Sequence, residues 1–136
     1  MGLENGITIY GRTRAGKAYL AHKWTKNHES YDEIGEYSFA YLRKYWGLRN
    51  EIITAMGFSE EGGSFEIDVN GLKDILKIYI EFLNPEIFDA HSCLWEYHIA
   101  VKNLSQGIYE MTEILADIEA KVVDAEDLEI RFYDSY

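Results

Sequence analysis

Near the start of the chain, one short segment has the residue types and the spacing that could bind phosphate. It reads GRTRAGKA from Gly11 to Ala18 and follows an apolar alternation that predicts a strand. A glycine, four residues and then Gly-Lys form a loop whose backbone N–H groups can surround phosphate oxygens, while the lysine reaches the outer phosphates. Gly11, Gly16 and Lys17 are therefore candidate phosphate-binding residues.

This segment resembles the Walker A motif of P-loop nucleotide-binding proteins over eight residues, and the resemblance implies a bound nucleotide with magnesium. It departs from the motif at Ala18, which has no hydroxyl group for the metal ion. No later apolar strand ends in a metal-binding aspartate. Apolar and polar residues alternate over 18–24, which predicts a second strand, or a short helix, after a basic hairpin turn. Nucleotide binding is kept as an alternative function.

His91, Cys93 and His98 are residue types that bind metal ions. On a helix, His91 and His98 are separated by about 10.5 Å of rise, too far for two ligands that must each lie ~2 Å from one zinc ion. Cys93 would point to a different face of that helix. The sequence also has no motif that pairs a nucleophile with a base. We predict no metal, no cofactor and no catalytic residues, and therefore a protein that is not an enzyme.

The most distinctive candidate site is a row of carboxylates in the second half of the chain. The row comprises Glu110, Glu113 and Asp117 on one face of a long predicted helix, then Asp124, Glu126 and Asp127. Carboxylates three or four residues apart on a helix are separated by roughly 4.5–6 Å along its axis, a spacing of the same order as that of nucleic-acid phosphates. The row could imitate nucleic acid in front of a basic cleft. The simpler interpretation is a solvated helix face.

Aromatic residues favour an interface over a merely solvated face. The chain contains eleven tyrosines and three tryptophans, and these side chains provide rigid contact area with a polar tip. Trp95 and Tyr109 are fourteen residues apart, so a helix would bring both to about the same side, next to the carboxylates. We expect these two residues to anchor the binding site.

Charge is unevenly distributed along the chain. The formal net charge is −11, with +3 over residues 1–50 and −14 over residues 51–136. Such an acidic protein repels nucleic acid and anionic membranes and attracts basic surfaces. The basic residues near the start, from Arg12 to Lys26, could pair internally with the acidic remainder or contact an acidic partner. With Cys93 as the only cysteine, and no signal peptide or apolar span, we expect a cytoplasmic protein.

The hydrophobic periodicity predicts one α+β domain over residues 1–136, with about three helices packed on a small, mainly antiparallel sheet. The predicted order is β-β-α-β-α-α-β. Strands are expected near 7–10, 18–24, 65–69 and 128–132. Helices are expected near 31–56, over 72–83 with Asn70 as a cap, and over 90–120 after a restart at Pro85. Gly57 should end the first helix, and Gly107 should mark a close crossing or a bend in the last.

These observations favour a small acidic protein that binds and blocks another protein. The expected partner is a basic nucleic-acid-processing factor or a toxin, as for immunity proteins and phage anti-defence inhibitors, with no direct nucleic-acid or membrane partner. One alternative is a nucleotide or phosphate binder built on Gly11–Lys17. Another is a structural subunit that self-associates through the long helix, for example as a homodimer.

Overall fold

The computed structural model describes residues 4–24, 35–43, 45–91 and 97–135. Within these ranges the chain forms four strands, five α-helices and one 3-10 helix, which confirms the predicted α+β class. In chain order the elements are β1 (Glu4–Gly11), α1 (Arg14–Trp24), β2 (Glu36–Arg43), α2 (Trp46–Met56), β3 (Gly63–Ile67), α3 (Val69–Glu81), α4 (Pro85–His91), α5 (Tyr97–Glu119), η2 (Ala125–Asp127) and β4 (Leu128–Ser135).

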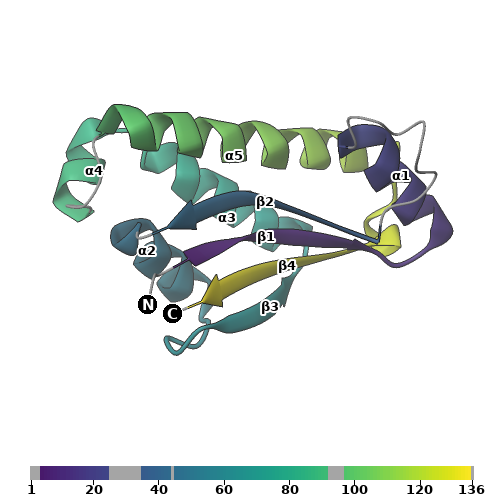
Figure 1. Cartoon of the computed structure of the whole chain (residues 1–136), viewed down its shortest axis with the longest axis horizontal. Helices are drawn as coiled ribbons and strands as arrows, with labels where there is room; N and C mark the ends of the chain where they lie inside the picture. The colour runs from purple at the N-terminus through teal and green to yellow at the C-terminus, as the bar shows by residue number, and fades with distance from the viewer. Residues whose placement is uncertain (1–3, 25–34, 44, 92–96, 136) are drawn as a thin grey trace.

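The four strands form one antiparallel sheet in the order β2-β1-β4-β3. β1 and β4 pair along their whole length, from Glu4 opposite Ser135 to Gly11 opposite Leu128. In Figure 1, α5 runs along the sheet beside β2, and α3 lies behind the strands. α1 lies at one end of the strands with η2, and α2 and α4 lie at the other end. The fold therefore places β2 and β3 at the two edges of the sheet.

Two predicted elements differ from the structure. Over 18–24 the strand is wrong and the alternative, a short helix, is correct, because the segment belongs to α1, with Tyr19, Leu20 and Ala21 buried. The single helix predicted over 31–56 is instead β2 followed by α2, while residues 31–34 lie outside the described ranges. The order is therefore β-α-β-α-β-α-α-α-β in the described part of the chain, with five helices where about three were predicted.

A β-bulge in β2 explains why the sequence resembles a helix there. The pairing with β1 shifts register between Asn5 and Ile7, and Ala40 has a positive φ of 54°. The extra residue puts Phe39 and Leu42, three positions apart, on the same buried side of the strand. Apolar residues three positions apart also occur on one face of a helix, so periodicity alone could not separate the two.

The remaining elements agree more closely with the prediction. β3, α3 and β4 form where they were expected, and α5 lies within the predicted long helix. Gly57 ends α2 in the left-handed conformation, with φ of 68°, and its N–H donates to the carbonyl of Ile53. The cap of α3 is Asp68 rather than Asn70, because the Asp68 carboxylate accepts the N–H of Gly71 at 2.7 Å.

The core depends on a close contact between α5 and β2. A Cβ atom on Gly107 would lie 2.8 Å from a ring carbon of Tyr79 and 3.2 Å from Cβ of Ala40. The Tyr79 ring is completely buried, and its hydroxyl donates to the carbonyl of Ala40 at 3.0 Å. Neither neighbour can easily move, so glycine is required at this position. The predicted close crossing at Gly107 is confirmed.

We predict that Gly107→Ala destabilises the protein by about 1–3 kcal/mol through overpacking. This loss should exceed the gain of about 1 kcal/mol that alanine ordinarily brings to a helix. Urea unfolding measures the effect, and Ser105→Ala, at an exposed position of the same helix, is the control. A Gly107→Ala variant as stable as the wild type would contradict the close packing.

Candidate functional site

The predicted row of carboxylates is divided among three environments, and only part of it faces solvent. Glu110, at the middle of α5, is only 6 % exposed. Its carboxylate accepts the hydroxyl of Tyr37 in β2 at 2.9 Å and the side-chain amide of Gln106 at 3.3 Å. Burial raises the pKa of Tyr37, and the Glu110 carboxylate raises it further. Glu110 thus faces β2 rather than a solvated surface.

Glu113 and Asp117 join α5 to α1. The ammonium group of Lys23 lies 3.4 Å from a carboxylate oxygen of Glu113 and 3.1 Å from one of Asp117. Asp117 also accepts the hydroxyl of Tyr19 at 2.6 Å. Burial lowers the pKa of Lys23, but Asp117 and Glu113 outweigh this effect, so the net pKa is raised. The basic start of the chain therefore pairs internally with acids of the second half, one of the two uses considered for it.

Asp127 has a structural contact with the start of α1. Its carboxylate accepts the Thr13 hydroxyl at 2.8 Å, and its backbone carbonyl accepts the Arg12 N–H at 2.8 Å. Asp124 and Glu126, in the same connection between α5 and β4, are exposed, and neither forms an ion pair with any residue the structure describes. Of the predicted acidic residues, these two carboxylates are the ones most available to a partner.

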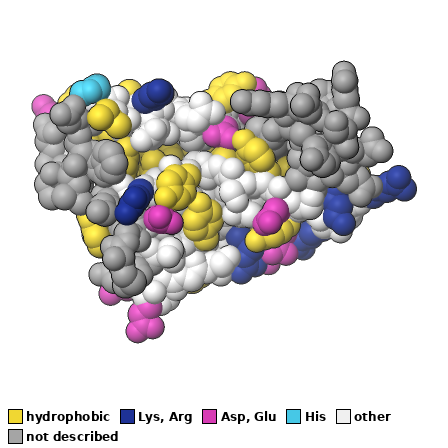
Figure 2. Space-filling view, viewed as in Figure 1, with side chains coloured by type: hydrophobic (Ala, Val, Ile, Leu, Met, Phe, Trp, Pro, Cys, Tyr) yellow, Lys and Arg dark blue, Asp and Glu magenta, His cyan; other side chains and the backbone are white. Residues whose placement is uncertain are grey.

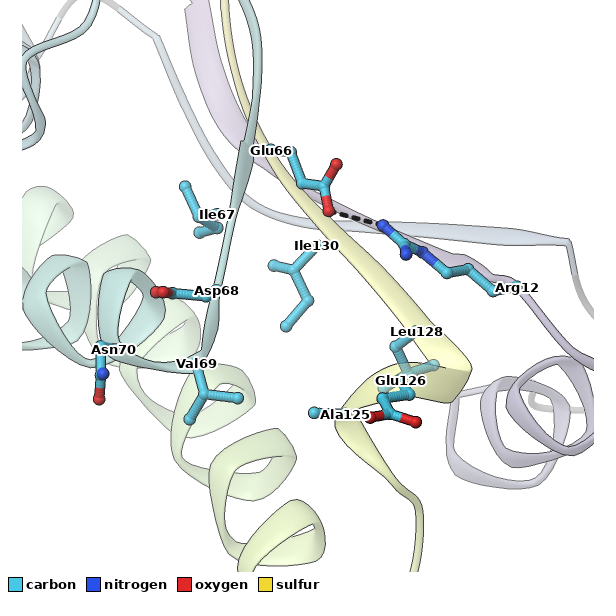
Figure 3. Close-up of a pocket in the computed structure, with 10 residues that line it drawn as sticks. All are labelled: Arg12, Glu66, Ile67, Asp68, Val69, Asn70, Ala125, Glu126, Leu128 and Ile130. Carbon is cyan, nitrogen blue, oxygen red and sulfur yellow. Dashed lines mark hydrogen bonds and ion pairs between the residues drawn. The ribbon is translucent and has the colours of Figure 1, made fainter.

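A cavity of about 340 Å³ lies beside Glu126, between the junction of β3 with α3 and the start of β4. Figure 3 shows its lining, which combines apolar side chains with charged ones: Ile67, Val69, Leu128 and Ile130, with Arg12, Glu66, Asp68 and Glu126. The Arg12 guanidinium lies 2.6 Å from Glu66 and 3.3 Å from Glu129, so its charge is neutralised within the fold. The cavity therefore has an apolar wall and, at its edge, the carboxylate of Glu126, which forms no ion pair with another described residue.

The predicted phosphate-binding loop has the required order of strand, loop and helix, because α1 begins at Arg14. Its contacts differ from those of a phosphate site. The N–H of Gly16 donates to the Thr13 hydroxyl at 3.1 Å. A Cβ on Gly16 would lie 2.1 Å from the Asp127 carbonyl oxygen, and one on Gly11 would lie 2.6 Å from the Lys17 side chain. Gly11 and Gly16 thus allow close packing, and the Asp127 carboxylate lies where a phosphate would be repelled.

Of the two predicted aromatic anchors, only Tyr109 lies within the described residues. Tyr109 is 59 % exposed on α5, and a hydrogen bond with Glu113 raises the pKa of its hydroxyl. Trp95 lies outside the described residues, and so does Cys93. On the side of the molecule that Figure 2 draws, hydrophobic side chains lie between acidic and basic ones. Tyr109 therefore remains available for contact with a partner.

A second hollow, which sequence reasoning missed, lies between β2 and α5. It encloses about 290 Å³ and is lined by residues 37–41 of β2 and by Asn103, Gln106, Gly107 and Glu110 of α5. A neighbouring hollow of about 290 Å³ shares Tyr41 and Asn103 and extends to Arg43 and Tyr45. The sequence could not reveal this groove, because the bulged strand that forms one wall was interpreted as a helix.

Among the described residues, no group of three or more His, Cys, Asp or Glu side chains could hold a metal ion. No helix in the described ranges combines the length and the apolar character needed to cross a membrane. Comparisons with protein-family models, with curated proteins and with solved structures found no significant match to this chain.

Buried tyrosines should make the fold sensitive to high pH. Burial raises the pKa of Tyr19 and Tyr79 above the usual value of 10.0, and Asp117 raises that of Tyr19 further. The unfolded chain therefore loses these protons first. The contribution of these two protonated tyrosines to the free energy of unfolding is complete below about pH 10. At higher pH it should fall by up to about 1.4 kcal/mol per pH unit for each tyrosine.

Urea unfolding between pH 7 and 11.5 measures this loss. Tyr79→Phe should be less stable at pH 7, because the hydrogen bond to Ala40 is lost, but its stability should decline less steeply above pH 10. The comparison isolates one tyrosine from the lysines that titrate in the same range. Equal slopes for the two proteins, or normal ionisation of Tyr79 in the folded protein by absorbance near 295 nm, would contradict the expected shift.

Proposed function

We propose that this protein binds another protein through the acidic connection between α5 and β4, and that binding blocks a basic surface of the partner. The supporting observation is that Asp124 and Glu126 are exposed and without an ion pair in the described part of the chain, and that Glu126 lines the 340 Å³ cavity. The proposed partner is a nucleic-acid-processing factor or a toxin, and the protein would act as an inhibitor of the immunity or anti-defence type. A cytoplasmic location belongs to the same proposal.

The cavity suggests how a basic partner would be recognised. Lysine and arginine carry an aliphatic stem that can lie on apolar surface while the charged head stays near solvent. Ile67, Leu128 and Ile130 provide such a surface, and Glu126 lies at its edge. A side chain from the partner could therefore insert between the β3–α3 junction and η2, with its charge next to Glu126.

The typical energies of exposed ion pairs and of buried apolar side chains give charge and burial different roles in the proposed complex. An exposed ion pair contributes about 0–1 kcal/mol, so Asp124 and Glu126 alone cannot hold a complex together. Their attraction would mainly speed association and would weaken with salt, because exposed charges are screened over ~8–10 Å. Most of the affinity would come from apolar and aromatic side chains that become buried, among them Tyr109.

The two alternative functions have less structural support. A nucleotide at Gly11–Lys17 would lie close to the Asp127 carboxylate. The N–H of Gly16, which its phosphate would need, already donates to the Thr13 hydroxyl. Self-association through the long helix would use the hollow of about 510 Å³ between α3 and α5, which is lined by Leu76, Leu115 and Ile118 together with charged residues at its edge. Neither arrangement explains the exposed acidic connection.

The proposal predicts a partner that is captured at low salt and lost from a double variant. Asp124→Asn with Glu126→Gln removes two charges at the site, whereas Glu61→Gln with Asp74→Asn removes two exposed charges elsewhere. Each protein is immobilised, incubated with native extract at low and at moderate salt, and the bound proteins are identified by mass spectrometry. The association and dissociation rates of the partner are then measured.

We expect the site variant to slow association several-fold and the control variant to change it little. Tyr109→Ala should mainly accelerate dissociation, provided that it unfolds at the wild-type temperature. Equal effects of the two charge variants would show that only net charge matters, and a partner insensitive to both would place the binding surface elsewhere. A partner that keeps its activity in the complex would exclude an inhibitor.

A further inference from the structure

We infer that the face of the sheet turned away from the core binds a second copy of this chain, so that two sheets pack face to face in a weak dimer. Side chains alternate between the two faces of a strand, and Ile7, Ile9 and Phe132 are buried on the core side. The residues between them form the outer face. The dimer is independent of the proposed function, because it uses another surface and another partner.

The outer face presents aromatic side chains to solvent. In Figure 1, which looks onto this face, α3 lies behind the strands and the other helices lie along its edges or at its ends. Tyr41 and Tyr10 are 53 % and 38 % exposed, and Figure 2 shows hydrophobic side chains at this surface. Tyr133 is half-buried over β1, because a Cβ on Gly6 would lie 2.6 Å from its hydroxyl oxygen. Tyrosines provide contact area at low entropic cost, which suits a protein interface.

Ion pairs within the outer face balance the charges of its β3 and β4 side. The Arg12 guanidinium lies 2.6 Å from Glu66 and 3.3 Å from Glu129, and that of Arg131 lies 3.0 Å from Glu129. Two cations therefore stand beside two carboxylates. These side chains are already held in place, so another molecule that packs on them orders fewer free rotamers.

The remaining charges of the outer face are nearly balanced as well. Glu4 of β1 stands opposite Arg43 of β2 in the strand register, and Glu36 stands opposite Tyr10. The described residues of this face thus carry a formal −1 in a protein of net charge −11. Like charges across an interface repel, and most of the negative charge lies on other surfaces. Two copies that meet through this face keep that charge apart, and arginines of one copy can meet glutamates of the other.

The size and shape of the outer face suit a second sheet. Strands of eight residues, spaced ~4.8 Å apart with ~3.3 Å per residue, give a face of roughly 19 by 26 Å. Two such faces cover roughly 1,000 Å² in total, the lower limit for a specific interface. At the centre, the hydroxyls of Thr8 and Ser38 lie 3.0 Å apart and bond to each other. These short side chains leave room for tyrosines of the other copy, as in packed sheets ~10 Å apart.

Sedimentation velocity on the intact chain, from micromolar to millimolar concentration and at low and high salt, tests the dimer. Tyr41→Glu and Tyr10→Glu each place a charge on the outer face. Ile80→Glu, at a 49 % exposed position of α3, adds the same charge on the helical side and is the control. Circular dichroism verifies that each variant is folded. NMR of the ¹⁵N-labelled wild type shows which amide signals change with concentration.

We expect the wild type to dimerise with a micromolar Kd, and Tyr41→Glu and Tyr10→Glu to raise that Kd about tenfold or more. Ile80→Glu should raise it about twofold at most. Salt should strengthen the dimer several-fold, because it screens the repulsion between two acidic copies. Capture of a basic partner should weaken with salt instead. The concentration-dependent amide signals should lie in 4–10, 38–43 and 129–135.

Each of three results would overturn the dimer through the outer face. The first is a protein that stays monomeric, with amide signals independent of concentration, up to the millimolar range. The second is an equal effect of Tyr41→Glu and Ile80→Glu, which would show that only net charge matters. The third is a dimer lost only in Ile80→Glu, with signals of α3 and α5 changing, which would assign self-association to the helical side. The capture experiment with Asp124 and Glu126 tests the proposed function separately.

Discussion

The contact at Gly107 determines how close α5 can approach the sheet, and the rest of the structure depends on that distance. With glycine at this position, Tyr79 and Ala40 reach the helix backbone, and the Tyr79 hydroxyl holds the carbonyl of the bulge. The same approach brings Glu110 against Tyr37. A larger residue at Gly107 would move the helix outward and separate the polar groups that now bond across the interface.

The acidic composition has two different physical uses in this fold. Some carboxylates connect elements inside the fold. Asp117 accepts a hydrogen bond from Tyr19 and forms an ion pair with Lys23, both in α1, and Asp134 forms an ion pair with Arg49 in α2. Others, such as Asp124 and Glu126, remain exposed. Removing one partner of a buried pair such as Arg49 and Asp134 typically costs 3–5 kcal/mol, whereas an exposed carboxylate contributes little to stability. Some of the acidic residues behind the net charge of −11 are therefore paired inside the fold, and a partner could contact only the exposed ones.

How much could be predicted depended on how local each signal was. β3, α3, β4 and the stop at Gly57 follow from short-range patterns and turn residues, and these were predicted correctly. β2 was missed because its bulge imitates helical spacing. The internal roles of Glu113 and Asp117 could not be read from the sequence, because Lys23 lies some ninety positions away and only the folded topology brings them together. The helix that carries Glu110, Glu113 and Asp117 was therefore predicted correctly, but the separation of the acidic residues into internal and exposed groups needed the three-dimensional arrangement.

The strand order also constrains when this chain can fold during synthesis. Among the strands that the structure describes, β4 comes last in the chain, yet it lies between β1 and β3 and is the strand that pairs with β3. Until residues 128–135 have left the ribosome, β1 and β2 can pair with each other, but β3 has no strand beside it. Closing a loop from Glu4 to Ser135 is slow compared with forming local helices. The nascent chain must therefore keep the apolar side of β1 and β3 from other contacts until residues 128–135 are available, and apolar surface that is exposed in this way favours aggregation and chaperone binding.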